Sequence, residues 1–175
     1  MIGSMSRLLA LALVLAIGGP AAVVPAVAQP RPGVAAPDVT GGPWINSRPL
    51  TLAELRGRVV LVDFWTFTCI NWLRTEPYVR AWSQAYRDDG LVVIGVHTPE
   101  FFWEKSYDKV VEASGRLGLR YPIVQDNDMV IWNRWSVRAW PTLVLVDKRG
   151  VVRHRHIGEG DYEQTETIIR RLLAE

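Results

Sequence analysis

Cys69 is the only cysteine of the 175-residue chain, and it stands where two kinds of sequence meet. The preceding run, Val59–Trp65, is rich in β-branched and aromatic residues, which predicts a buried strand. The residues that follow have helical character, so Thr68 and Cys69 are expected where a helix begins. Backbone N–H groups and the helix dipole at such a position favour the nucleophilic thiolate. The pattern predicts a reactive thiol, and the alternative is an inert, buried cysteine.

The composition is that of a globular domain. The residues are 49% hydrophobic and 22% charged, so a chain of this length can bury a substantial core. The formal net charge is only +2, with 20 basic and 18 acidic residues and no long basic run. Composition therefore gives no indication of a nucleic-acid partner.

Residues 1–28 differ from the rest of the chain. They contain one charged residue, Arg7, then an apolar stretch, and end in the small residues Ala26-Val27-Ala28 that a signal peptidase favours. We interpret them as a signal peptide, which predicts an exported, periplasmic protein. A retained membrane anchor is the less favoured alternative, because glycines and prolines interrupt the apolar run before it reaches the roughly 20 residues that a membrane span needs.

After this segment, residues 29–38 are rich in proline and alanine and are interpreted as a linker, and residues 39–175 as one domain. The order strand, helix, strand across residues 59–96 predicts a parallel βαβ unit, which places both strand ends at the edge beside Cys69. Hydrophobic periodicity predicts strands at 44–50, 59–65, 91–96, 121–125, 143–147 and 151–157, and helices at 69–89, 107–117, 127–135 and from 161.

Several landmarks together resemble the thioredoxin superfamily. They are Asp63-Phe64-Trp65 before Cys69, Pro77 eight residues after it, and Trp140-Pro141-Thr142 before a predicted hairpin. The runs DFWTFTCIN, GVHTPEF, DND and GEGDY are similar to exported redoxin domains of the TlpA, ResA and DipZ group. The resemblance covers residues 38–175. It implies an α/β thioredoxin fold, with a central mixed sheet flanked by helices and an N-terminal strand or hairpin extension.

The sequence departs from this family at one position. The family pattern is Cys-x-x-Cys, whereas Trp72 stands in place of the second cysteine here. In a dithiol enzyme the second thiol releases the mixed disulfide that the first thiolate has formed. Without that thiol, an external thiol must release the adduct. The Trp72 indole is expected to shield Cys69 or to offer an apolar platform, and the alternative is that it completes the core.

The resemblance also suggests residues that shape the site. Pro141 matches the cis-proline that faces the thiol, and Trp140 beside it would help to form an edge on which a substrate peptide docks. Asp63 matches a buried aspartate that assists proton transfer at the second cysteine. Because that cysteine is absent, a structural or pKa-tuning role for Asp63 is an equal alternative.

Two further residues follow the second core strand. Glu100 aligns with a carboxylate that related domains carry near the thiol, and it is either a tuning group for Cys69 or an exposed loop acid. His97 is a candidate base, although a lone histidine is more often a hydrogen-bonded structural group. His154 and His156 alternate onto one strand face, but no third ligand accompanies them, so we expect no metal and no cofactor.

These residues predict a redox protein that acts on thiols or disulfides through Cys69 alone. Its expected partners are protein or small-molecule thiols and, by resemblance, a membrane thiol electron transporter. One alternative is a one-cysteine peroxidase, because Thr66 stands where peroxiredoxins place a threonine, although Val62 replaces the proline of that motif. Another alternative is a redox-inactive binding module with the same fold.

Overall fold

The computed structural model describes residues 31–175. The proposed signal peptide, residues 1–28, lies outside this range. In residues 31–175 the helices are α1 (Ile70–Ala85), η1 (Phe102–Lys105, a 3-10 helix), α2 (Tyr107–Arg116), α3 (Val130–Arg134) and α4 (Tyr162–Ala174). The strands are β1 (Trp44–Ile45), β2 (Val59–Trp65), β3 (Leu91–His97), β4 (Ile123–Gln125), β5 (Thr142–Val146) and β6 (Val152–Ile157).

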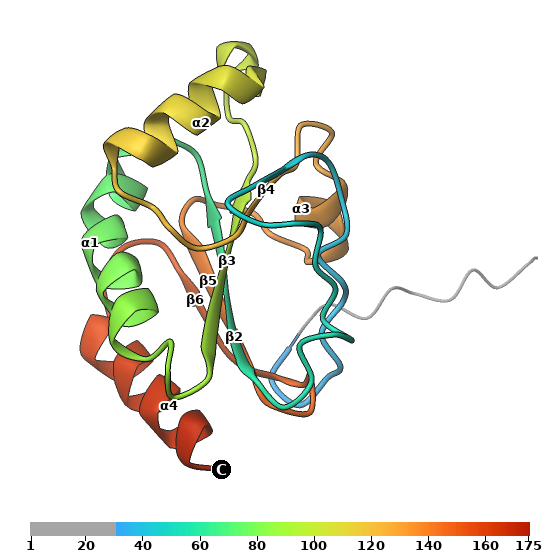
Figure 1. Ribbon diagram of the computed structural model, residues 1–175, viewed down its shortest axis with the longest axis vertical. Helices are drawn as coiled ribbons and strands as arrows, with labels where there is room; N and C mark the ends of the chain where they lie inside the picture. The colour runs from blue at the N-terminus through green and yellow to red at the C-terminus, as the bar shows by residue number, and fades with distance from the viewer. Residues whose placement is uncertain (1–30) are drawn as a thin grey trace, which may run out of the picture.

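The strands form one mixed six-stranded sheet in the order β1-β4-β3-β2-β5-β6. Strand β3 runs parallel to both β2 and β4, whereas β5 and β6 form an antiparallel hairpin beside β2. Helices α1 and α4 lie on one side of the sheet, and α3 and the N-terminal segment lie on the other (Figure 1). The predicted thioredoxin fold, its parallel βαβ unit and its C-terminal hairpin are confirmed. The N-terminal extension contributes β1, which pairs antiparallel with β4.

The alternation of side chains along β2 divides the core into two clusters. Val59, Leu61 and Trp65 pack in the cluster that includes α1 and α4, whereas Val60 and Phe64 pack in the cluster that includes α3. Successive strand residues point to opposite faces of a sheet, so Asp63 shares the face of Leu61 and Trp65. This register directs the Asp63 carboxyl group toward α1, the helix that begins beside Cys69.

The segment that precedes β1 is attached to the domain by hydrogen bonds. The backbone N–H of Gly33 donates to the carbonyl of Val152 at 2.8 Å, and Ala36 N–H donates to Gly150 at 2.9 Å. The Asp38 carbonyl accepts bonds from Arg134 and from the indole of Trp135. Residues 33–38 of the proposed linker therefore lie against the sheet and α3.

The structure differs from the sequence expectations at the end of α1 and after β3. Helix α1 ends at Ala85 rather than near residue 89, and the chain then turns through Gly90, whose φ of 106° a glycine adopts without steric cost. The 3-10 helix η1 has no counterpart among the predicted elements. Within residues 31–175, no helix is long and apolar enough to cross a membrane.

Close packing on the α1 side of the sheet generates a stability prediction. Gly95 pairs with Asp63 across β2 and β3, and an added Cβ atom would lie 2.8 Å from Trp65 Nε1 and 3.1 Å from Tyr121 Cε2. We expect Gly95→Ala to reduce the free energy of unfolding by about 1–3 kcal/mol through overpacking, measured by urea denaturation. Gly115→Ala is the matched control. It lies in α2 with no atom within 4 Å of the added Cβ, and should stabilise by about 0.5–1 kcal/mol. Equal effects at the two positions would contradict this account of the packing.

Candidate active site around Cys69

Cys69 occupies the N-cap of α1, as the sequence predicts for the thiol. Its backbone is extended, with φ −68° and ψ 112°, and its side chain makes no capping hydrogen bond. The side chain is partly buried, and its sulfur is free of any disulfide. The first turn of α1 contains no acidic residue, so the positive end of the helix dipole faces the sulfur without a neutralising side chain from that turn.

The segment Trp140-Pro141 lies opposite the thiol. The Cys69 sulfur is 3.9 Å from the carbonyl oxygen of Trp140, and the peptide bond that follows is cis, as the resemblance implies. The Trp140 indole N–H donates to the carbonyl of Thr98 at 3.0 Å, and its ring packs 4.2 Å from that of Trp132. Trp140 and Pro141 therefore form a fixed wall beside the sulfur.

Trp72 is a core residue and not a surface shield. Its side chain is fully buried, and its indole N–H donates to Asp63 Oδ2 at 2.9 Å. The residue at the position of the second family cysteine is therefore bonded to the aspartate that would serve that cysteine. This geometry agrees with the alternative that Trp72 completes the core. It does not agree with the expectation that the Trp72 indole offers an apolar platform for a client, because the side chain is fully buried.

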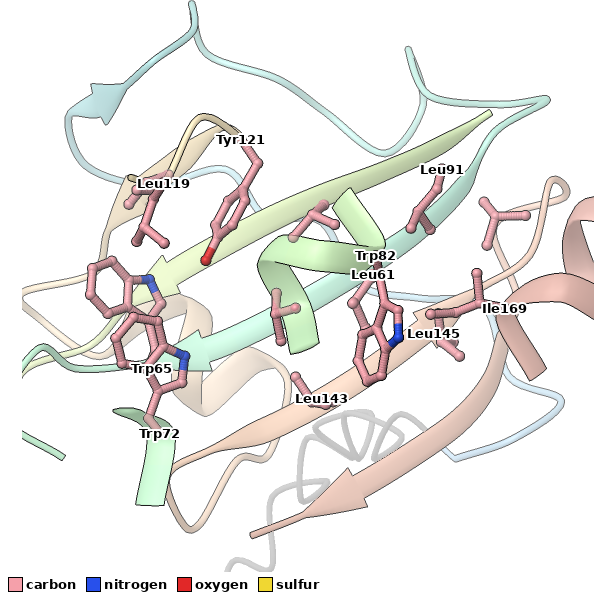
Figure 2. Packing of buried hydrophobic residues seen from close by; sticks show 14 of the residues in the cluster. Leu61, Trp65, Trp72, Trp82, Leu91, Leu119, Tyr121, Leu143, Leu145 and Ile169 are labelled. Atoms are coloured by element: carbon pink, nitrogen blue, oxygen red, sulfur yellow. The ribbon is translucent and has the colours of Figure 1, made fainter. Parts of the chain in front are cut away.

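Trp65, Trp72 and Tyr121 form a packed aromatic cluster next to this bond. The Trp65 and Trp72 rings stack with centroids 4.3 Å apart at 28°, and Figure 2 shows Tyr121 beside them with its hydroxyl directed toward the strands. Asp63 Oδ1, Trp65 Nε1 and the Tyr121 hydroxyl are buried and have no hydrogen-bond partner within residues 31–175. The Trp72 bond is thus the main compensation that the Asp63 carboxylate receives.

Burial strongly perturbs the acidity of Asp63. Removal from water raises the pKa of its carboxyl group from 3.8 to about 7, the bond from Trp72 opposes that increase, and the nearby charge of Glu76 adds to it. Burial and the same two carboxylates also raise the pKa of Tyr121 well above 10. The structural or pKa-tuning interpretation of Asp63 fits a carboxyl group that titrates near neutral pH behind the site.

The carboxylate that contacts the Cys69 turn is Glu104 and not Glu100. Glu104 in η1 is fully buried and accepts a short hydrogen bond from the hydroxyl of Thr68, the residue before Cys69. Glu100 is exposed, and its backbone N–H donates to Glu104 at 2.7 Å. The alternative that Glu100 is an exposed loop acid fits the structure. The sequence pattern does not indicate Glu104, because the short 3-10 helix η1 that brings it to Thr68 leaves no periodic pattern in the sequence.

His97 is buried at the end of β3, behind the same turn. Its Nε2 lies 3.3 Å from the hydroxyl of Thr66, and its ring stacks on Phe67 at 5.5 Å. Burial lowers the pKa of His97 from 6.5 to about 4, against the opposing charge of Glu104. His97 is therefore neutral at neutral pH, and its Nε2 is directed to Thr66, which matches the structural alternative for this residue.

Exposed apolar side chains lie at the start of α1, directly after Cys69, and in η1. Ile70, directly after the thiol, is 59% exposed, and Phe102 in η1 is 79% exposed. Phe101 and Trp103 stack with centroids 4.6 Å apart, and Phe102 meets Trp103 edge to face. These aromatic residues directly precede the buried Glu104 in the sequence.

The histidines of β6 do not form a metal centre in the described chain. His156 Nδ1 lies 3.3 Å from Asp161 Oδ2, and His154 is partly buried with its pKa lowered by burial. Residues 31–175 contain no group of three or more histidine, cysteine or carboxylate side chains that could hold a metal ion.

The titration of Asp63 generates a prediction about stability and pH. Because folding raises its pKa, Asp63 stabilises the fold fully below pH 3.8, and this contribution is lost as the pH rises to about 7, a change on the order of 4 kcal/mol. His97 has the opposite sign, because its lowered pKa removes stability as the pH falls from 6.5 toward about 4. We expect Asp63→Asn to gain stability relative to wild type steadily between pH 4 and 7, measured by urea denaturation.

The matched control is Asp88→Asn, whose carboxylate is 92% exposed. Its stability difference from wild type should stay nearly constant over the same pH range. A difference between Asp63→Asn and wild type that does not change with pH would contradict the assignment of Asp63 as a buried titrating group.

Comparison with known proteins agrees with the fold. Residues 32–155 match the model of the AhpC/TSA family. Protein DipZ of Mycobacterium tuberculosis is 49% identical over 142 residues, which are 79% of this chain but 20% of that protein. The thiol-disulfide oxidoreductase YkuV of Bacillus subtilis is 28% identical and is covered over 94% of its length, as against 79% of this chain.

The crystal structure of the thioredoxin-like superfamily protein SPOA0173 matches with a TM-score of 0.76 at 26% identity, covering 81% of this chain and 97% of that one. This chain spans about a fifth of the length of the DipZ relative. The family match covers most of the described residues and includes Cys69, Trp72 and Pro141. The chain belongs to the AhpC/TSA family of redoxins and has its thioredoxin-like fold.

Proposed function

We propose that the protein is an exported thiol-disulfide exchange protein that acts through Cys69 alone. The observation that carries this proposal is the Cys69 sulfur at the N-cap of α1, beside the Trp140 carbonyl and with no second cysteine in the chain. The name of the similar YkuV protein, a thiol-disulfide oxidoreductase, supports thiol and disulfide partners, of protein or small-molecule type. The signal-peptide pattern of residues 1–28 supports export to the periplasm.

The reaction proceeds in three exchange steps. The Cys69 thiolate attacks one sulfur of a client disulfide, which forms a mixed disulfide and releases the other client sulfur as a thiolate that takes up a proton. The thiolate of an external thiol then attacks the mixed disulfide at the client sulfur and regenerates the Cys69 thiolate. The client leaves joined to the external thiol by a disulfide. A further external thiolate attacks that disulfide, forms a disulfide between the two external thiols and releases the client as a thiolate that takes up a proton. The fixed wall formed by Trp140 and Pro141 limits the directions from which a client can approach.

The identity of Trp72 supports the need for an external thiol. The position from which a second cysteine would attack is filled by a buried indole bonded to Asp63. A membrane thiol electron transporter is the proposed natural source of the external thiol, a role suggested by the resemblance to exported redoxins.

The peroxidase alternative has less support from the geometry. The Thr66 side chain is fully buried and its hydroxyl is already bonded to protein groups, His97 and Glu104, so it is not free to bind a peroxide at Cys69. A redox-inactive binding module would differ from the exchange protein and from the peroxidase because its Cys69 would be unreactive.

Three measurements separate the three functions. We expect the wild-type protein to reduce a protein disulfide only when glutathione is added, and to consume hydrogen peroxide no faster than Cys69→Ser. Alkylation of wild-type Cys69 should reach half its maximal rate at a lower pH than the same reaction of a free cysteine peptide, because the helix N-terminus favours the thiolate. Rapid peroxide consumption would identify the peroxidase, and an unreactive Cys69 would identify the binding module.

Restoring the second cysteine tests the role assigned to Trp72. We expect Trp72→Cys to form a disulfide with Cys69 and to reduce protein disulfides under dithiothreitol recycling faster than wild type. It should also lose about 3–5 kcal/mol of stability, because it replaces a fully buried indole. The control is Trp72→Phe, which loses the bond to Asp63 but gains no thiol. A wild-type protein that turns over protein disulfides without added thiols would refute this role of Trp72.

A further inference from the structure

Glu104 is a buried carboxylate that the exchange reaction as described above does not use. Its side chain is fully buried, although it lies in the short helix η1 among exposed aromatic residues. One carboxylate oxygen, Oε1, accepts the hydroxyl of Thr68, and the other accepts the backbone N–H groups of Glu100 and Phe101 at 2.7 and 2.9 Å. These bonds connect the loop after β3 to the turn that carries the nucleophile.

The bonds keep this carboxylate ionised. Burial acts to raise the pKa of Glu104, but hydrogen bonds from Thr68, Phe101, Thr66 and Glu100 outweigh it and hold the pKa below its usual 4.5. The other charged or titratable groups nearby do not neutralise it. His97 on β3 is uncharged at neutral pH, Glu100 on the preceding loop is an exposed acid, and Lys105 on η1 is exposed.

The Cys69 turn has few other side-chain attachments. The Cys69 N–H donates to the Thr66 carbonyl at 3.2 Å, and no side chain caps the start of α1. Hydrogen bonding from Thr66 also lowers the pKa of Glu104, but Thr68 is the residue directly before Cys69, so its bond to Glu104 holds the position next to the sulfur. Loss of the Thr68 bond would therefore free the residue next to the nucleophile.

We propose that Glu104 is a positioning residue for Cys69, which holds the thiol turn through Thr68 and places a buried negative charge behind it. This inference rests on the proposed role of Cys69 as the nucleophile. The two effects act on different observables. The bond to Thr68 fixes the direction of the sulfur toward a disulfide, whereas the charge opposes formation of the Cys69 thiolate and moves its reaction to higher pH.

Four variants separate geometry from charge. Glu104→Gln removes the charge but retains an oxygen for the backbone N–H groups and an amide that can donate to Thr68. Thr68→Val removes the bond with little change in side-chain shape and keeps the charge. Glu104→Ala removes both, and Glu100→Gln is the matched control for a nearby exposed carboxylate. Circular dichroism and urea denaturation establish that each variant is folded.

The readouts are the pH profile of iodoacetamide alkylation and the rate of reaction with a peptide disulfide at saturating pH. We expect Glu104→Gln to lower the pH of half-maximal alkylation by about half a unit or more, with a disulfide rate within twofold of wild type. Thr68→Val should slow the disulfide reaction at least threefold without that shift, and Glu104→Ala should show both effects. Glu100→Gln should match wild type in both measurements.

A folded Glu104→Gln with the wild-type alkylation profile would overturn the proposal, as would an equal shift in Glu100→Gln or a wild-type disulfide rate in Thr68→Val. Alkylation requires no disulfide partner, so it tests Glu104 separately from the exchange reaction. If wild-type Cys69 is alkylated but reacts with no disulfide, the proposed function fails while the alkylation profiles still decide the role of the charge.

Discussion

The hydrogen bond from the Trp72 indole to Asp63 is the constraint on which the rest of the site depends. Asp63 is fully buried on the α1 face of β2, where an unpaired carboxylate would be costly, and this bond is the one side-chain hydrogen bond recorded to it in the described chain. The bond anchors the first turn of α1 to the sheet, three residues after Cys69. Trp72, which replaces the second cysteine of the family pattern, therefore also stabilises the start of the helix that carries Cys69.

Two buried carboxylates bind residues on either side of Cys69 in the sequence. Asp63 reaches α1 through Trp72, and Glu104 reaches Thr68 from η1. They differ in ionisation because Glu104 accepts several hydrogen bonds whereas Asp63 accepts one, so the pKa falls for Glu104 and rises for Asp63. In the sequence, Cys69 therefore lies between Thr68, which is bonded to an ionised carboxylate, and Trp72, which is bonded to a carboxyl group that titrates near neutral pH.

The sequence was sufficient for the fold and for the position of the nucleophile. Strand β2 was predicted at its observed bounds because its run of β-branched and aromatic residues is continuous, and Cys69 was placed at a helix start by the change in pattern after it. Alternation along β2 also implies that Asp63 faces α1. The bond to Trp72 could not be predicted, because it depends on which side chain of the helix fills the space above the strand.

Glu104 shows more clearly which contacts cannot be predicted from the sequence. The resemblance to related domains suggests Glu100, but Glu100 is exposed. The turn of η1 instead brings Glu104, four residues later, into a buried position. The pairing of Thr68 with Glu104 joins positions 36 residues apart in the sequence through a segment without helical or strand periodicity. Contacts of this kind are determined by tertiary packing and not by local propensity.

The most direct measurement is the lifetime of the purified mixed disulfide between Cys69 and a client peptide, followed by mass spectrometry in buffer without thiols. An adduct that persists for hours and is released within minutes of adding glutathione is the result that this account predicts. An adduct that releases its client at the same rate with and without glutathione would contradict it.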